Sequence, residues 1–120
     1  MILLDTNALL WLIGAQKRTR RLVGRNDLCV SPASLLEIEM LIETARIELI
    51  GTIAGIREDD RWAIDDPPAA EWFAEAEGLA WTRDPFDRLL AAHARLRRWK
   101  LATSDARIIE HLGPSRILAL

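Results

Sequence analysis

Cysteine is nearly absent from this chain. The only one, Cys29, has no partner for an intrachain disulfide, and no CxxC pair of the zinc-binding kind is possible. It lies in the apolar run 28–30, where a free thiol usually serves as a small buried hydrophobe. Disulfide scaffolds and cysteine-based metal sites are therefore excluded.

Long apolar runs and targeting signals are also missing. No apolar run approaches the roughly 18 residues that a membrane span needs, and no basic and apolar signal segment precedes Asp5. Internal repeats and low-complexity linkers are absent as well. We therefore expect a cytoplasmic protein that has no membrane partner.

The overall composition is that of an ordinary globular domain. Half of the residues are hydrophobic and 28% are charged, which is too apolar for a disordered chain. A chain of this length buries about two-thirds of its unfolded surface in one core. We predict a single domain that spans residues 1–120.

Short apolar runs alternate with helical patterns along the chain. Strands are predicted at 2–4, 27–30, 99–103 and 117–120, and helices at 8–14, 19–24, 32–46 and 85–98. The middle, 51–77, predicts two helices interrupted at 65–68, because Pro67 and Pro68 cannot continue a helix. Such alternation is typical of an α/β fold in which right-handed crossovers build a parallel sheet covered on both faces.

Acidic residues occur where this fold places its ligands. Asp5 follows the first predicted strand directly, and Asp105 follows the strand at 99–103. The carboxyl ends of parallel strands and the amino ends of the following helices share one edge. Asp87, in the first turn of its helix, and Glu37, at the margin of an apolar helix face, should reach the same edge. Each acid alone is explained as a helix cap or surface residue, so only their convergence predicts a site.

Four carboxylates without histidine or cysteine companions predict a site for a hard cation. Oxygen ligands suit Mg²⁺ or Mn²⁺, which also bind phosphate oxygens. Two such ions can activate water and stabilise a leaving oxygen in phosphodiester cleavage. A histidine-based nuclease mechanism is disfavoured, because neither His93 nor His111 adjoins a strand end; His93 is expected to be structural or partly exposed.

The chain also resembles a known family along nearly its whole length. Four segments carry the resemblance: MILLDTNALLW at 1–11, SPASLLEI at 31–38, DPFDRLLAAH at 84–93 and LATSD at 101–105. Their order and spacing resemble PIN-domain proteins, specifically the VapC-type toxin ribonucleases of type II toxin–antitoxin systems. The resemblance implies a three-layer α/β/α sandwich with a short central parallel sheet, Mg²⁺ or Mn²⁺ as cofactor, an RNA substrate, a cognate antitoxin protein and a homodimer.

The resemblance also implies roles for individual residues. By resemblance, the metal-binding and catalytic residues are Asp5, Glu37, Asp87 and Asp105. The residues that the resemblance implies orient the site are Thr6, Asn7, Ser34 and Thr103. The activity implied is that of a metal-dependent endoribonuclease, which hydrolyses RNA with a metal-activated water. The alternative is a catalytically silent PIN fold that binds RNA or protein as a regulatory module. Cleavage of DNA is also open, because carboxylates do not read a 2′-hydroxyl.

Two other classes of acid-rich α/β protein fit less well. Haloacid dehalogenase-type phosphotransferases carry a DxDxT motif after their first strand. In this chain Asn7 stands at the position of the second aspartate of that motif. A response-regulator receiver domain expects a lysine after a late strand, but the last predicted strand ends this chain.

Positive charge gathers early in the chain although the net charge is −2. The net charge gives no global reason to bind nucleic acid, but a local basic patch can guide a phosphate backbone. We predict that this early cluster contacts RNA, with a solvated surface as the alternative. Its predicted RNA-binding members are Lys17, Arg18, Arg20 and Arg21.

Overall fold

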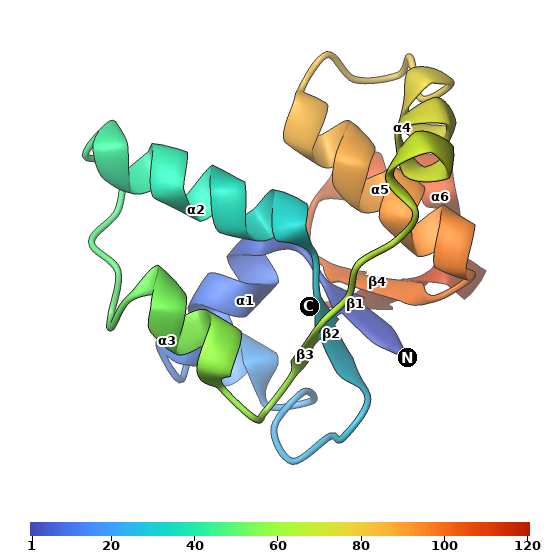
Figure 1. Cartoon of the computed structure of the whole chain (residues 1–120). Helices are drawn as coiled ribbons and strands as arrows, with labels where there is room; N and C mark the ends of the chain where they lie inside the picture. The colour runs from blue at the N-terminus through green and yellow to red at the C-terminus, as the bar shows by residue number, and fades with distance from the viewer.

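The computed structural model describes all 120 residues, and its strands and helices alternate along the chain (Figure 1). The strands are β1 Ile2–Leu4, β2 Leu28–Val30, β3 Ala63–Ile64, β4 Lys100–Thr103 and β5 Ile117–Ala119. The α-helices are α1 Thr6–Ile13, α2 Pro32–Glu43, α3 Ile53–Glu58, α4 Ala69–Glu77, α5 Pro85–Arg97 and α6 Ala106–Leu112. Two 3₁₀ turns, η1 Lys17–Thr19 and η2 Pro114–Arg116, complete the elements.

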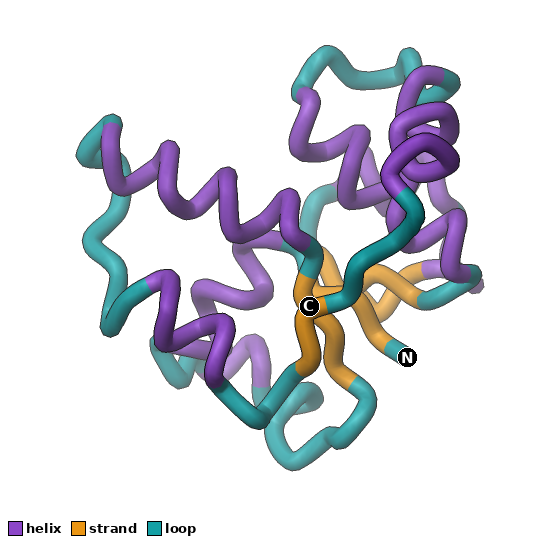
Figure 2. Tube along the Cα trace, viewed as in Figure 1, coloured by secondary structure: helices purple, strands orange, loops and turns teal.

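The five strands form one parallel sheet in the order β3-β2-β1-β4-β5. Leu3 of β1 pairs with Cys29 of β2 on one side and with Leu101 of β4 on the other. The sheet lies between the helices in Figure 2. The predicted parallel α/β architecture is confirmed, and β1, which Asp5 follows, is the central strand.

Side chains alternate between the two faces of the sheet, as the twofold period of a strand requires. Leu4 and Val30 pack with α1, α2 and α3 on one face, whereas Leu3, Cys29 and Leu101 pack with α5 and α6 on the other. The fourth helix, α4, packs against α5 through Trp72 and alanine side chains. Figure 1 shows the two helical groups on opposite sides of the sheet, which confirms the predicted three-layer sandwich.

Two local predictions are wrong, and one strand was missed. Residues 19–24 form turns instead of a helix, since only Lys17–Thr19 makes a 3₁₀ turn and the segment ends at Gly24 with φ of 79°. The helix from Pro32 ends at Glu43, because Thr44 bonds back to two helix carbonyls and Ala45 is left-handed. The edge strand β3 was not predicted, because it has only two residues and neither is fully buried.

Asp65, which directly follows β3, connects this strand to α5. Its carboxylate lies 2.7 Å from Nε2 of the fully buried His93 and accepts from Nε of Arg97 at 2.9 Å. Burial alone would raise the pKa of Asp65, but the bonds from Arg97 and His93 outweigh it and lower that pKa. The contacts tie the end of β3 to α5, which gives His93 the structural role predicted for it.

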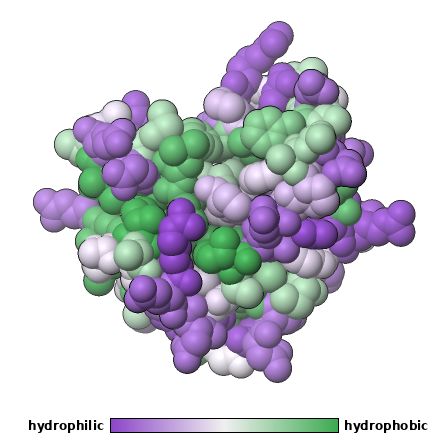
Figure 3. All heavy atoms as spheres, in the orientation of Figure 1, coloured by the Kyte–Doolittle hydropathy of each residue, from purple (hydrophilic) through white to green (hydrophobic).

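The aromatic residues of the middle segment divide between core and surface. Trp62 and Trp72 are buried, and Trp72 donates from Nε1 to the Leu89 carbonyl at 2.8 Å, whereas Phe73 is 54% exposed. On the face shown in Figure 3, apolar side chains gather on the side of α2 and α3 and are bordered by hydrophilic ones. None of the helices has the length and hydrophobicity of a membrane span.

Candidate metal-binding site at the carboxyl edge of the sheet

Asp5 stands at the carboxyl end of the central strand and also caps the next helix. Its Oδ1 accepts from the Ala8 N–H at 2.7 Å, which fixes the carboxylate at the start of α1. The side chain is only 6% exposed. The capping role and the predicted place at the sheet edge therefore coexist in one residue.

Asp105 repeats this arrangement after the neighbouring strand β4. Its Oδ1 accepts from the N–H groups of Arg107 at 2.9 Å and Ile108 at 3.1 Å, and so caps α6. The buried Thr103 hydroxyl accepts from the Asp105 N–H at 3.0 Å. Because β1 and β4 pair directly, the two aspartates lie at the same edge.

Glu37 reaches this edge from α2 and is held by α1. The Thr6 hydroxyl donates to Glu37 Oε1 and also lies 3.1 Å from the Ser34 hydroxyl. Thr6 and Ser34 are both buried. The Thr6 hydroxyl therefore links α1 to both Glu37 and Ser34 of α2.

Among the four predicted acids, Asp87 is the one whose carboxylate accepts no hydrogen bond from the protein. Asp84 caps α5 by accepting from the N–H groups of Phe86 at 2.8 Å and Asp87 at 3.2 Å, which places Asp87 in the first turn. The Asp87 side chain accepts no hydrogen bond of its own. Its carboxylate is therefore free to take a ligand.

A small cavity of about 60 Å³ brings these side chains together. Asn7 also borders it, with an exposed side chain that makes no hydrogen bond. Leu41, Leu90 and Ile108 form its apolar part. The acids that line it are the four predicted from the sequence, Asp5, Glu37, Asp87 and Asp105.

The carboxylates perturb one another in this cavity. Burial, followed by the charges of Asp84 and Asp105, raises the pKa of Asp87 to about 7. Burial also raises the pKa of Glu37, with Asp84 and Asp5 adding to the effect and Thr6 opposing it. Burial raises the pKa of Asp5, although bonds from Thr103 and the Ala8 N–H oppose it. Negative charge is therefore costly here, and a cation would relieve that cost.

The carboxylate oxygens of these four acids are suitable ligands for a hard divalent cation. Carboxylate oxygens are the ligands that Mg²⁺ and Mn²⁺ prefer, and the caps of Asp5 and Asp105 use only one oxygen of each side chain. No three potential ligands are yet close enough together to form a finished metal site. Ion binding would therefore require small side-chain movements.

The predicted RNA-binding cluster is partly engaged with the protein. The Arg18 guanidinium lies 3.9 Å from the centre of the Trp11 ring, and Arg21 donates to the Ala119 carbonyl at 2.9 Å. Lys17 and Arg20 are exposed and make no ion pair. Since Ala119 ends β5, Arg21 is anchored at the same edge of the sheet as the acids.

Asp84 is not among the four acids that the sequence predicted for the site. It does cap α5, but its charge also acts on Glu37 and Asp87. The sequence feature that could have indicated this effect is the Asp-Pro-Phe-Asp spacing, which puts the carboxylates of Asp84 and Asp87 within one helical turn.

Open α/β proteins bind their ligands at the carboxyl edge of the sheet, and the four acids meet at this edge. The particular family follows from the sequence: residues 2–113 match the PIN domain model. The chain therefore belongs to the PIN domain family, which confirms the resemblance.

Solved structures with the same fold are distant in sequence. One described as a toxin-antitoxin complex from Klebsiella pneumoniae is 15% identical, with a TM-score of 0.71, and the alignment covers 98% of this chain and 96% of that one. FitAcB from Neisseria gonorrhoeae is 19% identical, with a TM-score of 0.56 and coverage of 100% and 96%. FitAB bound to an IR36 DNA fragment is also 19% identical, with a TM-score of 0.54 and coverage of 99% and 94%. No curated protein matches the chain in sequence.

Proposed function

We propose that this chain is a metal-dependent endoribonuclease and the toxin of a bacterial toxin–antitoxin pair. PIN domains are generally nucleases. The observation that carries the proposal is the convergence of four carboxylates in one cavity, from α2, α5 and the residues that follow β1 and β4. The pKa values of three of them, Asp5, Glu37 and Asp87, are raised. A bound cation would offset the repulsion and desolvation of these carboxylates, which supports a metal-binding role.

The four acids Asp5, Glu37, Asp87 and Asp105 would hold Mg²⁺ or Mn²⁺. A bound ion of this type supplies Lewis-acid stabilisation of phosphate charge and activates water. The chain positions its ligands through the caps of Asp5 and Asp105 and the Thr6 bond to Glu37. Thr103 holds the turn between β4 and α6, and Asn7 borders the opening.

The proposed partners are RNA, a cognate antitoxin and a second copy of the chain. Similar folds occur in proteins described as a toxin-antitoxin complex and as FitAB, which supports an antitoxin partner. The exposed Lys17 and Arg20 support contact with a phosphate backbone.

A catalytically silent module that binds RNA or protein is the second candidate. The observation that favours it is that no three ligands are close enough to form a finished metal site. The two candidates differ in whether cation-dependent cleavage occurs.

Purified protein incubated with labelled RNA, with Mn²⁺ or with EDTA, tests the function. We expect cleavage with Mn²⁺ and none with EDTA. Glu37→Gln should abolish cleavage, whereas Glu39→Gln, an exposed acid on the same helix, should retain it. Cleavage in EDTA would contradict the metal role, and no cleavage of any RNA would favour the binding module.

A further inference from the structure

A second, larger cavity adjoins the acid-lined one. It has a volume of about 370 Å³ and lies between the C-terminal half of α2 and the beginning of α5. Glu37 and Leu41 border both cavities, so the two meet at these side chains. The volume is within the range of about 300–1,000 Å³ for small-ligand sites, which is large enough for part of a nucleotide.

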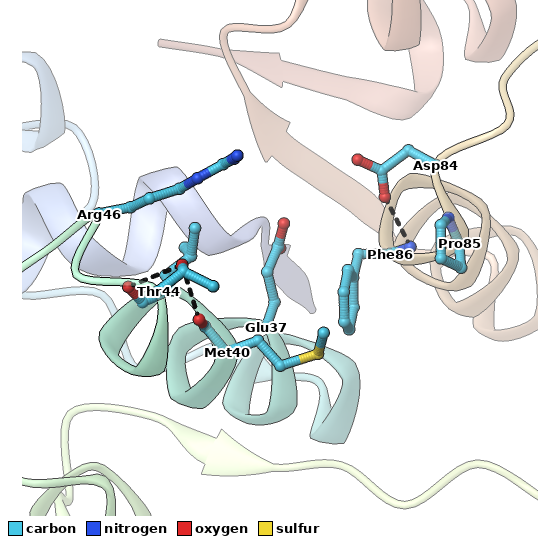
Figure 4. A pocket seen from close by; sticks show the side chains of 8 residues that line it. Glu37, Met40, Thr44, Arg46, Asp84, Pro85 and Phe86 are labelled. Carbon is cyan, nitrogen blue, oxygen red and sulfur yellow. Dashed lines mark hydrogen bonds between the residues drawn. The ribbon is translucent and has the colours of Figure 1, made fainter.

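Arg46 supplies the positive charge of this cavity. It is the only basic residue that lines either cavity, and its guanidinium makes no ion pair or hydrogen bond with the protein. Figure 4 shows its side chain extended into the space beside the Glu37 carboxylate. A guanidinium binds phosphate through paired hydrogen bonds. Arg46 is therefore available to a phosphate that the surrounding acids would otherwise repel.

Phe86 and Met40 supply an apolar wall on the other side. Figure 4 shows the Phe86 ring beside Glu37, with the Met40 side chain reaching toward it. Met40 is 45% exposed and Phe86 is half-buried. Aromatic rings stack with nucleic-acid bases, and methionine adapts to flat apolar ligands. The wall therefore suits a base.

We infer that this cavity binds one nucleotide of single-stranded RNA, next to the phosphate held at the acids. The base packs against Phe86 and Met40, and Arg46 contacts the phosphate of the same nucleotide. A single strand is required, because the bases of a duplex are stacked and do not reach a side pocket. The inference rests on the proposed function, since it assumes that RNA lies at the four acids.

A short single-stranded RNA that contains 2-aminopurine tests the base contact, because its fluorescence falls when the base stacks. With Ca²⁺ in place of Mn²⁺, wild-type protein should quench the probe. Phe86→Ala should remove the quenching and weaken binding by about tenfold. Phe86→Leu, which keeps apolar volume, should also lose quenching. Phe73→Ala removes an exposed phenylalanine from α4 and should behave as wild type.

The dependence of RNA affinity on salt tests the phosphate contact. Arg46→Gln should lower the slope of log affinity against log salt by about one, because one phosphate contact is lost. Arg46→Lys keeps the charge and should retain the slope. Arg57→Gln, an exposed arginine of α3 that makes no ion pair, is the matched control.

Cleavage by the wild-type protein with Mn²⁺ separates this inference from the proposed function. If wild-type protein cleaves RNA but Phe86→Ala and Arg46→Gln match their controls, the nucleotide site is refuted and the nuclease stands. If Phe86→Ala instead disrupts only self-association, the cavity belongs to a second copy of the chain, and the inference is also refuted. If quenching depends on Phe86 but no RNA is cleaved, the nucleotide site stands and the nuclease is refuted.

Discussion

Replacement of Asp87 by asparagine should stabilise the metal-free protein. Asp87 has a pKa of about 7 in the fold, against its ordinary 3.8, because it is partly buried beside other acids. A difference of this size corresponds to at most about 4 kcal/mol above pH 7. Solvent screening of the partly exposed carboxylate reduces this figure, and loss of the favourable helix-end charge removes about 0.3–1 kcal/mol.

The net gain that we expect is about 1–2 kcal/mol at pH 8, or a few degrees in Tm. Its pH dependence follows from the sign of the pKa change. The folded protein keeps the Asp87 proton to higher pH than the unfolded chain, so the contribution of Asp87 to wild-type stability falls as pH rises from about 4 to 7. The variant lacks this loss, and its advantage should therefore grow over that range and level off above it.

Urea unfolding followed by tryptophan fluorescence measures this effect at pH 5 and pH 8 in EDTA. Glu39→Gln, which neutralises an exposed acid of α2, is the control and should change stability little. Addition of Mn²⁺ should stabilise wild-type protein more than Asp87→Asn, because a ligand that binds only the folded state raises its stability. An Asp87→Asn protein that is less stable than wild type at pH 8, or whose advantage does not grow with pH, would refute the crowded-acid site.

Three further changes test the supporting residues. Thr6→Val removes the hydroxyl that donates to Glu37 and should cost about 1 kcal/mol in urea unfolding and lower the cleavage rate; unchanged cleavage would contradict its orienting role. Asp65→Asn disrupts the partly buried network with His93 and Arg97 and should cost about 1–2 kcal/mol without altering Mn²⁺ affinity, whereas weaker Mn²⁺ binding would link this network to the site. Arg20→Glu should weaken RNA binding in a filter assay at low salt, with the difference shrinking as salt rises; a salt-independent result would make this residue part of an ordinary solvated surface.

Much of the site could be predicted from the sequence because its acids mark the ends of strands and the starts of helices. Asp5 and Asp105 each follow a short apolar run and cap the next helix. Strand and cap signals are local, so they are readable without tertiary structure. Their meeting in one cavity also follows from the sheet order, which places β1 beside β4.

The features that were not predicted depend on contacts between distant residues. The edge strand β3 has too few residues to show a periodic pattern, and it forms by pairing with β2. The contact of Asp65 with His93 could not be predicted, because the two residues are 28 positions apart. Arg46 joins the second cavity only because α2 ends early, at Glu43. Such features appear only when the chain has folded.

Direct titration of Mn²⁺ into the protein by isothermal calorimetry tests the four-acid site most directly. Wild-type protein should bind Mn²⁺, and binding should release protons near neutral pH because the pKa of Asp87 is about 7. Asp105→Asn, which keeps an N-cap for α6, should bind far more weakly. A wild-type protein that does not bind Mn²⁺, or an Asp105→Asn protein that binds it equally well, would contradict a metal site made by Asp5, Glu37, Asp87 and Asp105.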